Sequence, residues 1–275
     1  MKPIINLGSL EISTYALMIS LGASLGFWLT HREAERKRLD AMKLLALAAI
    51  AFGAGLLGAR ALNFTTSDPV GQASWWSVPA LWDHVGMSFY GGLGFAAFAG
   101  LAYARSQGLA PWEVADVLAV SFSPALALAR VGCFLNGCCY GTPTAGPFGL
   151  VAGGAPNSVN FGIPSHPTQL YEAAAALALF GWLWHLRSRR RFVGQLAVAF
   201  LAAYPLFRFF QEFLRGDPRP AWQFGSFAVL SLNQILSLGV MAFALVAGAA
   251  LERRRDDSVH GPKEAMSPAG PRAHR

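Results

Sequence analysis

Residues 114–135 read VADVLAVSFSPALALARVGCFL, and this stretch decides the class of fold. Its charged side chains are Asp116 and Arg130, which lie near its two ends. A helix needs about 20 apolar residues to cross the roughly 30 Å hydrocarbon core of a bilayer. The length and composition of the stretch therefore predict a membrane-spanning helix.

Six further stretches have the same character, and the whole composition agrees with them. Hydrophobic residues make up 54% of the chain and charged residues 13%, against roughly 25% charged in soluble domains. We therefore predict an all-α, polytopic membrane protein of about seven transmembrane helices. The other six predicted spans are residues 13–31, 44–62, 86–104, 168–186, 192–214 and 228–251.

We predict that the spans form one domain, residues 1–255, and we find no internal repeat. Residues 256–275 are polar and contain proline and glycine, a composition typical of disorder. We expect them to be a disordered cytoplasmic tail. The first apolar stretch is interpreted as a retained span and not as a cleaved signal.

Basic residues alternate between the connections and predict the orientation. Arginines or lysines follow the first, third, fifth and seventh spans, whereas residues 63–85 and 131–169 contain none. Arg215 and Arg219 are the exception. The positive-inside rule then predicts an N-terminus outside and a C-terminus in the cytoplasm. Topology accounts for the net charge of +7 better than nucleic-acid binding does.

Ionisable residues inside the predicted spans mark candidate functional positions, because burying charge in a membrane is costly. Arg208 and Glu212 are spaced i, i+4 and can pair on one helix face; a structural and a functional interpretation of this pair both remain open. Arg130 has no acidic residue near it in sequence, and a guanidinium at headgroup depth can bind a phosphate. Asp116 fits a structural ion pair better.

Polar residues from five different spans are expected at one depth, near the outer surface. Tyr15 and Tyr90 open the first and third spans, and Glu172 opens the fifth. Together with the two arginines they predict a site for an anionic phospholipid headgroup.

The three cysteines form one cluster in sequence, Cys133-x4-Cys138-Cys139. The spacing differs from paired Cys-x2-Cys metal ligands and no second pair exists, so we predict no metal site. Buried packing, a disulfide on the oxidising side and a reactive thiol remain open. No cofactor or nucleotide site is evident.

Several motifs in this order resemble the prolipoprotein diacylglyceryl transferase family. The His-Pro-x-Gln-Leu-Tyr-Glu string and the Arg-x-Gly pattern followed by Asn-Gly are the most specific. The stretches that carry the resemblance are residues 15–18 (YALM), 86–93 (GMSFYGGL), 129–141 (ARVGCFLNGCCYG), 166–172 (HPTQLYE), 204–215 (YPLFRFFQEFLR) and 233–236 (NQIL).

The resemblance implies an enzyme of the bacterial inner membrane that acts in lipoprotein biosynthesis. Such an enzyme joins the diacylglyceryl group of phosphatidylglycerol to the lipobox cysteine of a prolipoprotein signal-peptide segment, and glycerol 1-phosphate leaves. Its partners are then this lipid, the prolipoprotein and the surrounding membrane lipids, with no nucleic acid.

The resemblance also implies roles for individual residues. Arg130 and Arg208 would hold the phosphate, and Glu212 would orient Arg208. Tyr15 would support headgroup binding, while Asn136 and Gly141 would shape the signature loop. His166 and Glu172 would anchor the fifth span.

This sequence departs from the family pattern at three positions. Tyr90 stands where the family has a histidine proposed to handle the proton, and a phenol with a pKa of about 10 is a poor base near neutral pH. Cys133 stands in place of an asparagine and Cys138 in place of an acid. Outer-face His84 or His166 are substitute bases to consider.

Two other functions remain open from the sequence. One is a relative with a different acceptor, or one that uses Cys138 or Cys139 as its own carrier. The other is a non-catalytic phospholipid-binding or transport protein. A retinal protein is excluded because the seventh span has no lysine. The transferase hypothesis predicts that activity depends on Arg130 and Arg208 and tolerates the family's residues at Cys133 and Cys138.

Overall fold

The computed structural model describes residues 4–7, 10–66, 89–151, 162–216, 221–224 and 228–260. These residues contain seven α-helices, one for each span predicted from the sequence. The helices are α1 (Thr14–Arg36), α2 (Ala41–Thr66), α4 (Phe89–Ser106), α5 (Pro111–Asn136), α6 (Thr168–Leu186), α7 (Gln195–Gln211), continued by the 3-10 turn η1 (Glu212–Leu214), and α8 (Leu232–His260).

Four of the described helices are long and apolar enough to cross a membrane. They cover Ala41–Ala61, Pro111–Asn136, Gln195–Leu214 and Leu232–Arg255. The predicted all-α, polytopic membrane architecture is therefore confirmed. The orientation of the chain in the membrane stays a prediction.

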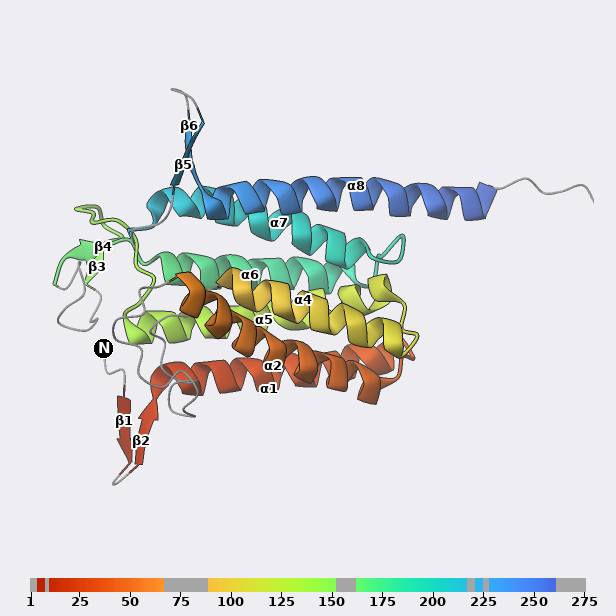
Figure 1. Ribbon diagram of the computed structural model, residues 1–275, viewed down its shortest axis with the longest axis horizontal. Coiled ribbons are helices and arrows are strands. Elements are labelled where there is room, and N and C mark those ends of the chain that lie inside the picture. Colours follow the sequence, from red (N-terminus) through yellow and green to blue (C-terminus); the bar gives the residue numbers. More distant parts are fainter. Residues whose placement is uncertain are drawn as a thin grey trace, which may run out of the picture.

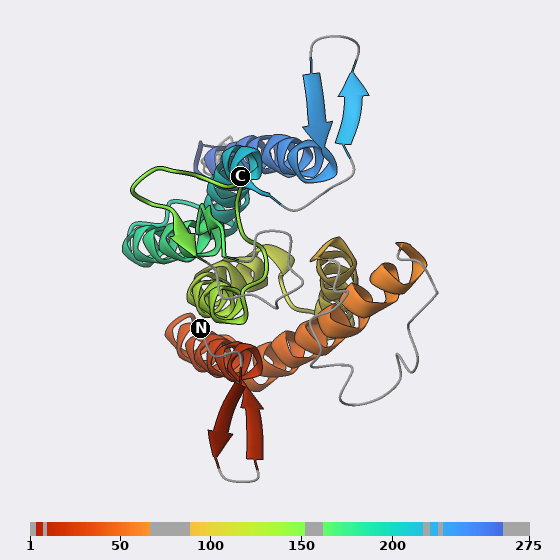
Figure 2. The ribbon, with the colours of Figure 1, turned by 90° about the vertical axis from the view of Figure 1, so that its left-hand side faces the viewer.

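Helix α5 lies at the centre of the bundle (Figure 2). It packs against α1 on one side and against α6 and α7 on the other, while α2 pairs with α4 and α7 with α8. The main buried cluster joins α5, α6 and α7 through small and aliphatic side chains such as Val120, Leu126, Ala176 and Leu183. Small residues let membrane helices approach closely.

Glycine allows a close contact between α1 and α5 near the start of α1. A Cβ atom on Gly132 of α5 would lie 2.9 Å from the Cβ of Met18 and 3.5 Å from Cδ2 of Tyr15. Real Cβ atoms do not tolerate the shorter distance, so α1 and α5 can meet here only because residue 132 has no side chain.

Short antiparallel hairpins gather at one end of the bundle (Figure 1). We name this end, where α1, α6 and α8 begin and α5 and α7 finish, the loop end. The strands are β1 (Ile4–Leu7) with β2 (Leu10–Ser13), β3 (Leu150–Val151) with β4 (Pro164–Ser165), and β5 (Ala221–Phe224) with β6 (Ala228–Ser231).

The opposite end carries the arginine-rich connections, and we name it the basic end. The turns that link α1 to α2, α4 to α5 and α6 to α7 all lie there (Figure 1). Helix α8 continues to His260 at this end, so its last turn enters the segment expected to be a tail. Residues 261–275, the rest of that segment, lie outside the described residues.

Candidate functional site

A buried ionic cluster occupies the loop end between α5, α6 and α7. Nη2 of Arg130 lies 2.9 Å from Oε1 of Glu172, and Nη1 of Arg208 lies 3.6 Å from the other carboxylate oxygen, Oε2. The hydroxyl of Tyr204 donates to Oε1 of Glu172 at 2.6 Å. Glu172 is only 1% exposed, so a carboxylate from α6 lies between arginines from α5 and α7.

A second carboxylate holds Arg208 from its own helix. Nη2 of Arg208 lies 3.3 Å from Oε2 of Glu212, which confirms the pairing predicted from their spacing. Oε1 of Glu212 accepts hydrogen bonds from the Ser231 hydroxyl at 2.9 Å and from Nδ2 of Asn233 at 2.6 Å. Glu212 therefore links Arg208 to the start of α8.

Not every polar atom of the cluster is satisfied. Nε of Arg130 is buried and has no hydrogen-bond partner within the part of the chain that the structure describes. Oε2 of Glu172 likewise accepts no hydrogen bond there, because its ion pair with Arg208 is too long for one. Buried polar groups normally find partners. The buried N–H of Arg130 is therefore a donor that the described residues leave unsatisfied.

The segment after α5 is fastened across this cluster. The amide of Gly141 donates to the carbonyl of His166 at 2.8 Å, and the amide of Thr142 donates to the carbonyl of Leu214 at 2.8 Å. A Cβ on Gly141 would come within 2.7 Å of His166 and 2.6 Å of the Leu214 carbonyl. Gly141 thus allows three backbones to converge over the site.

The three thiols also meet at the loop end. The Sγ atoms of Cys133, Cys138 and Cys139 all lie within 4.8 Å of one another, and all three cysteines are free. A disulfide, one of the three interpretations that the sequence left open, is therefore not formed among these cysteines in this structure. Asn136, the last residue of α5, reaches Cys138 with its side chain.

The two loop cysteines differ in acidity. Hydrogen bonds from Cys133 and Cys138 lower the pKa of Cys139 well below its usual value despite burial, and the positive charges of Arg215 and Arg130 add to this effect. The thiol of Cys133 lowers the pKa of Cys138, but the hydrogen bond with Cys139 and burial outweigh it and raise that pKa to about 11.

The structure places the side chains of two more predicted site residues, Tyr15 and His166. Tyr15 faces this region from α1, within electrostatic range of Arg130 and the cysteines. His166 lies beside the site through its backbone, and its Nδ1 lies 3.2 Å from the Tyr171 hydroxyl. Tyr90 is the second residue of α4, but its side chain lies outside the described part of the structure, as does all of His84.

Arg130 and Glu172, which the sequence left as separate candidates, pair in the structure. Arg130 has an acidic partner after all, Glu172, which is 42 positions away in sequence (172 − 130). Tyr204 was not singled out, although Tyr204, Arg208 and Glu212 repeat every four residues and so share one face of α7. That four-residue periodicity is the sequence signal that could have identified Tyr204 as a member of the site.

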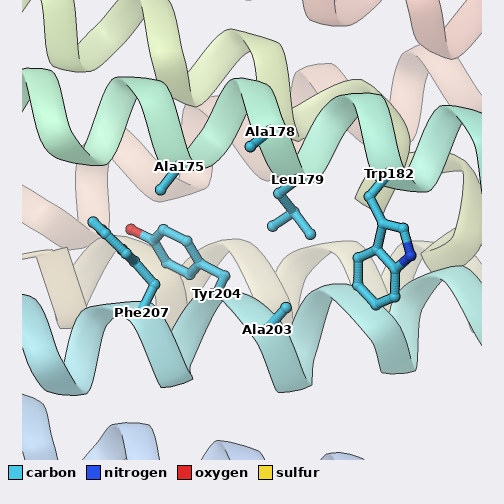
Figure 3. Close-up of a pocket in the computed structure, with 7 residues that line it drawn as sticks. All are labelled: Ala175, Ala178, Leu179, Trp182, Ala203, Tyr204 and Phe207. Atoms are coloured by element: carbon cyan, nitrogen blue, oxygen red, sulfur yellow. The ribbon is translucent and has the colours of Figure 1, made fainter.

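An apolar groove lies between α6 and α7 (Figure 3). Its volume is about 300 Å³. Tyr204 and Phe207 lie at one end and Trp182 at the other, and the Tyr204 hydroxyl points toward α6 (Figure 3). The remaining lining residues are Ala175, Ala178, Leu179 and Ala203. Because Tyr204 also binds Glu172, this residue connects the groove to the charged cluster.

A second ionic cluster lies at the basic end and has a different construction. Oδ1 of Asp116 accepts from the amides of Leu196 and Ala197 at 2.9 and 3.0 Å, and Oδ2 accepts from the amide of Gly194 at 3.0 Å. Nη1 of Arg190 lies 2.8 Å from Oδ2. Asp116 therefore caps the start of α7, and the predicted structural role is supported.

Fold and site together define a polytopic helical membrane protein with a buried arginine–carboxylate cluster beside an apolar groove. Comparison with known proteins identifies the family. The family model described as prolipoprotein diacylglyceryl transferase matches residues 2–249. The chain belongs to that family.

Individual relatives extend over nearly the same length. A protein from Nitratidesulfovibrio vulgaris strain Miyazaki F is 33% identical over 244 residues, which cover 85% of this chain and 87% of the relative. One from Geobacter sulfurreducens is 34% identical over 260 residues, which cover 90% and 94%. Both are named phosphatidylglycerol–prolipoprotein diacylglyceryl transferase.

Proposed function

We propose that this protein transfers the diacylglyceryl group of phosphatidylglycerol to the lipobox cysteine of a prolipoprotein, releasing glycerol 1-phosphate. It would do so in the bacterial inner membrane, during lipoprotein biosynthesis. The observation that carries the proposal is the Arg130–Glu172–Arg208 cluster adjoining the groove between α6 and α7. Family membership and the names of the relatives support it.

The two arginines suit the lipid phosphate. The Arg130 and Arg208 side chains are 14% and 12% exposed, so they are largely shielded from water yet reachable. Charge-assisted hydrogen bonds from guanidinium to phosphate are short and strong. The unpaired Nε of Arg130 supplies a donor that a phosphate oxygen would accept from. Glu172 would keep both guanidiniums in place before the lipid arrives.

The groove suits one acyl chain of the same lipid. Its lining is apolar except for the Tyr204 hydroxyl, and that hydroxyl is bound to Glu172. A chain lying along α6 and α7 would therefore place its glycerol end at the ionic cluster. Binding of the acyl chain in the groove and of the phosphate at the arginines would hold the reacting carbon in one position. This lowers the entropic part of the activation barrier.

The chemistry forms one bond and breaks one. The acceptor thiol loses its proton, and the thiolate attacks the carbon of the diacylglycerol unit that bears the phosphate oxygen, so a thioether forms as that C–O bond breaks. The electron pair of that bond stays on the departing phosphate. Arg130 and Arg208 would stabilise this growing negative charge. Electrostatic stabilisation of the transition state is usually the largest single contribution to enzyme catalysis.

Other residues would assist without contacting the reacting atoms. Glu212, which is held by Ser231 and Asn233, would orient Arg208. Asn136 and Gly141 would shape the segment over the site, and Tyr15 would support the headgroup. Tyr90 stays a proposed site residue at the start of α4. An N-terminus outside and a C-terminus in the cytoplasm would place the whole site at the outer leaflet.

A product assay tests the proposal. Purified protein in micelles containing phosphatidylglycerol receives a lipobox peptide, and mass spectrometry measures the diacylglyceryl thioether. We expect product with the wild type and almost none with Arg208→Ala. Arg189→Ala, which removes an exposed arginine at the basic end, is the matched control and is expected to behave like the wild type.

The assay also separates the alternatives. Absence of product with bound phosphatidylglycerol would contradict the transferase and favour a lipid-binding protein. If the lipobox peptide gives no thioether but another thiol compound does, the protein uses a different acceptor. A peptide with serine in place of the acceptor cysteine controls for transfer to other groups.

A further inference from the structure

The three cysteines, whose spacing in sequence predicted no metal site, are brought together by the way α5 ends. The helix stops at Gly137, whose φ of 76° is left-handed, and the amide of Cys138 folds back to the carbonyl of Cys133 at 3.2 Å. Such a glycine-capped turn returns the chain over the last helical turn. It therefore carries Cys138 and Cys139 onto Cys133.

The backbone around the thiols is fixed from outside the turn. The Thr168 hydroxyl donates to the carbonyl of Cys139 at 2.8 Å, and Nε2 of Gln169 donates to the carbonyl of Cys138 at 2.6 Å. Cys139 itself has a φ of 64°, which is rare for a residue with a side chain. Uncommon backbone conformations persist where the surroundings enforce them, often at functional sites.

We propose that Cys133, Cys138 and Cys139 form a three-thiolate site for Zn²⁺, whose fourth position takes the acceptor thiol of the substrate. The Sγ atoms are mutually within 4.8 Å, and tetrahedral Zn–S bonds of roughly 2.3 Å need S–S separations of about 3.8 Å. Small side-chain rotations would close the difference. The role of the fourth position rests on the proposed function, but the metal site does not.

The donor set selects the kind of ion. Three sulfur ligands favour a soft or borderline cation such as zinc over magnesium or calcium, which prefer oxygen. Structural zinc sites use four protein ligands, whereas catalytic sites use three and leave one position open. The cluster supplies three within the described part of the chain, which matches the open type.

Nearby positive charge partly balances the site. Three thiolates and one Zn²⁺ leave a net charge of −1, and a substrate thiolate makes it −2. Arg130 lies one turn before Cys133 on α5, and the positive charges of Arg130 and Arg215 act on Cys139. Arg215, together with Arg130, which also pairs with Glu172, therefore offsets part of the negative charge that the ion and its ligands would bury.

The reaction balances with zinc unchanged in oxidation state. The acceptor thiol binds Zn²⁺ and releases its proton to solvent, leaving a zinc-bound thiolate. Its electron pair forms the S–C bond while the C–O bond to phosphate breaks, and the phosphate retains that second pair. The thioether product is a weaker ligand than a thiolate and dissociates, because coordination favours the deprotonated sulfur.

Metal content of the purified full-length protein is the first measurement. The protein is purified with a tag that lacks histidine. We expect roughly one zinc per chain in the wild type. Cys133→Ser or Cys139→Ser should retain less than about a tenth of that zinc, because each variant removes one of the three ligands. His185→Ala, an exposed residue at the basic end, is the control for adventitious binding and should retain the ion. Circular dichroism checks that each variant is folded.

Cobalt substitution then tests the open position without measuring activity. Co²⁺ in the site should give the intense near-ultraviolet absorption of cobalt–thiolate bonds, and a lipobox peptide should increase it by adding a fourth sulfur. The serine-substituted peptide should not. A wild type with no more zinc than the cysteine variants, or thiol mapping that finds a disulfide within the cluster of the freshly purified protein, would overturn the metal site.

Comparing the two readouts distinguishes the two proposals. Zinc binding and a peptide-dependent cobalt spectrum without any thioether product would contradict the transferase and leave the metal site standing. Full transferase activity in protein stripped of zinc by a chelator would overturn the catalytic role of the ion and leave the transferase standing.

Discussion

The two ends of the bundle both bury ionic clusters, but only one of them is closed. At the basic end, Asp116 is fully buried and receives three backbone amides as well as Arg190. At the loop end, Glu172 is equally buried, yet its Oε2 has only a 3.6 Å ion pair, and Nε of Arg130 has no described partner. The first cluster is saturated by its own fold, and the second still has capacity to bind.

The two clusters differ because their carboxylates have different partners: backbone amides for Asp116 and side chains for Glu172. Helix α7 begins after Gly194, which has no side chain to cap the free amides, so Asp116 from α5 takes that role. Glu172 instead separates two guanidiniums and a phenol. Buried charges in a structural cluster pair with each other, whereas unpaired donors beside a groove indicate a ligand site.

Removing the closed cluster should have the largest effect, and that effect should be on stability. Asp116→Ala leaves three backbone amides without their acceptor, whereas Arg190 keeps its hydrogen bonds to Glu113. Each buried donor left without a partner costs about 1–3 kcal/mol. We expect a clearly lower midpoint of thermal unfolding in detergent. The protein that remains folded should catalyse at the wild-type rate. An unchanged midpoint would show that Asp116 is not structural.

Removing an arginine from the open cluster should affect turnover instead. Arg208→Ala should lower kcat/KM by about 10²–10³-fold, the size typical of losing a group that stabilises a developing oxyanion. Its unfolding midpoint should change less than that of Asp116→Ala. Initial rates and thermal scans on the same preparations measure both quantities, and equal destabilisation of the two variants would break the comparison.

The thiols provide a pH-dependent test of the loop end in metal-free protein. Both Cys138 and Cys139 are partly exposed, so their alkylation rates should report their pKa values. Cys138, with a pKa of about 11, stays protonated near neutral pH, and its thiolate fraction should rise about tenfold per pH unit until that value. Cys139, whose pKa is lowered, should react first. Peptide mapping after iodoacetamide labelling measures the order, and preferential labelling of Cys138 at pH 7 would refute it.

The smallest effect should come from the phenol that joins groove and cluster. Tyr204→Phe keeps the ring in the groove and removes the hydrogen bond to Glu172. A hydrogen bond to a charged group contributes about 1.5–3 kcal/mol to stability, so we expect a lower midpoint of thermal unfolding. Because Glu172 also holds both arginines, we expect a loss of kcat/KM that is smaller than that of Arg208→Ala. Tyr171→Phe removes another hydroxyl at this end and is the matched control. A full wild-type rate in Tyr204→Phe would show that the hydrogen bond between Tyr204 and Glu172 is not needed for catalysis.

The sequence predicted the helices well because their signal is local. Each span is a run of apolar residues, and all seven predicted spans correspond to helices. The i, i+4 pair of Arg208 and Glu212 was found for the same reason. The partner of Arg130 was missed because Glu172 lies on another helix, and no spacing rule connects residues that meet only through packing.

By itself, the sequence determined that this protein is a bundle of membrane helices with arginines near one end, because hydrophobicity and charge placement act residue by residue. Only the tertiary structure decided which charges pair, that Asp116 caps α7 from a different helix, and that three cysteines come together. These outcomes depend on how α5 packs against its neighbours and on how its last turn folds back at Gly137. Such geometry arises from contacts between distant segments, which no local pattern in the sequence specifies.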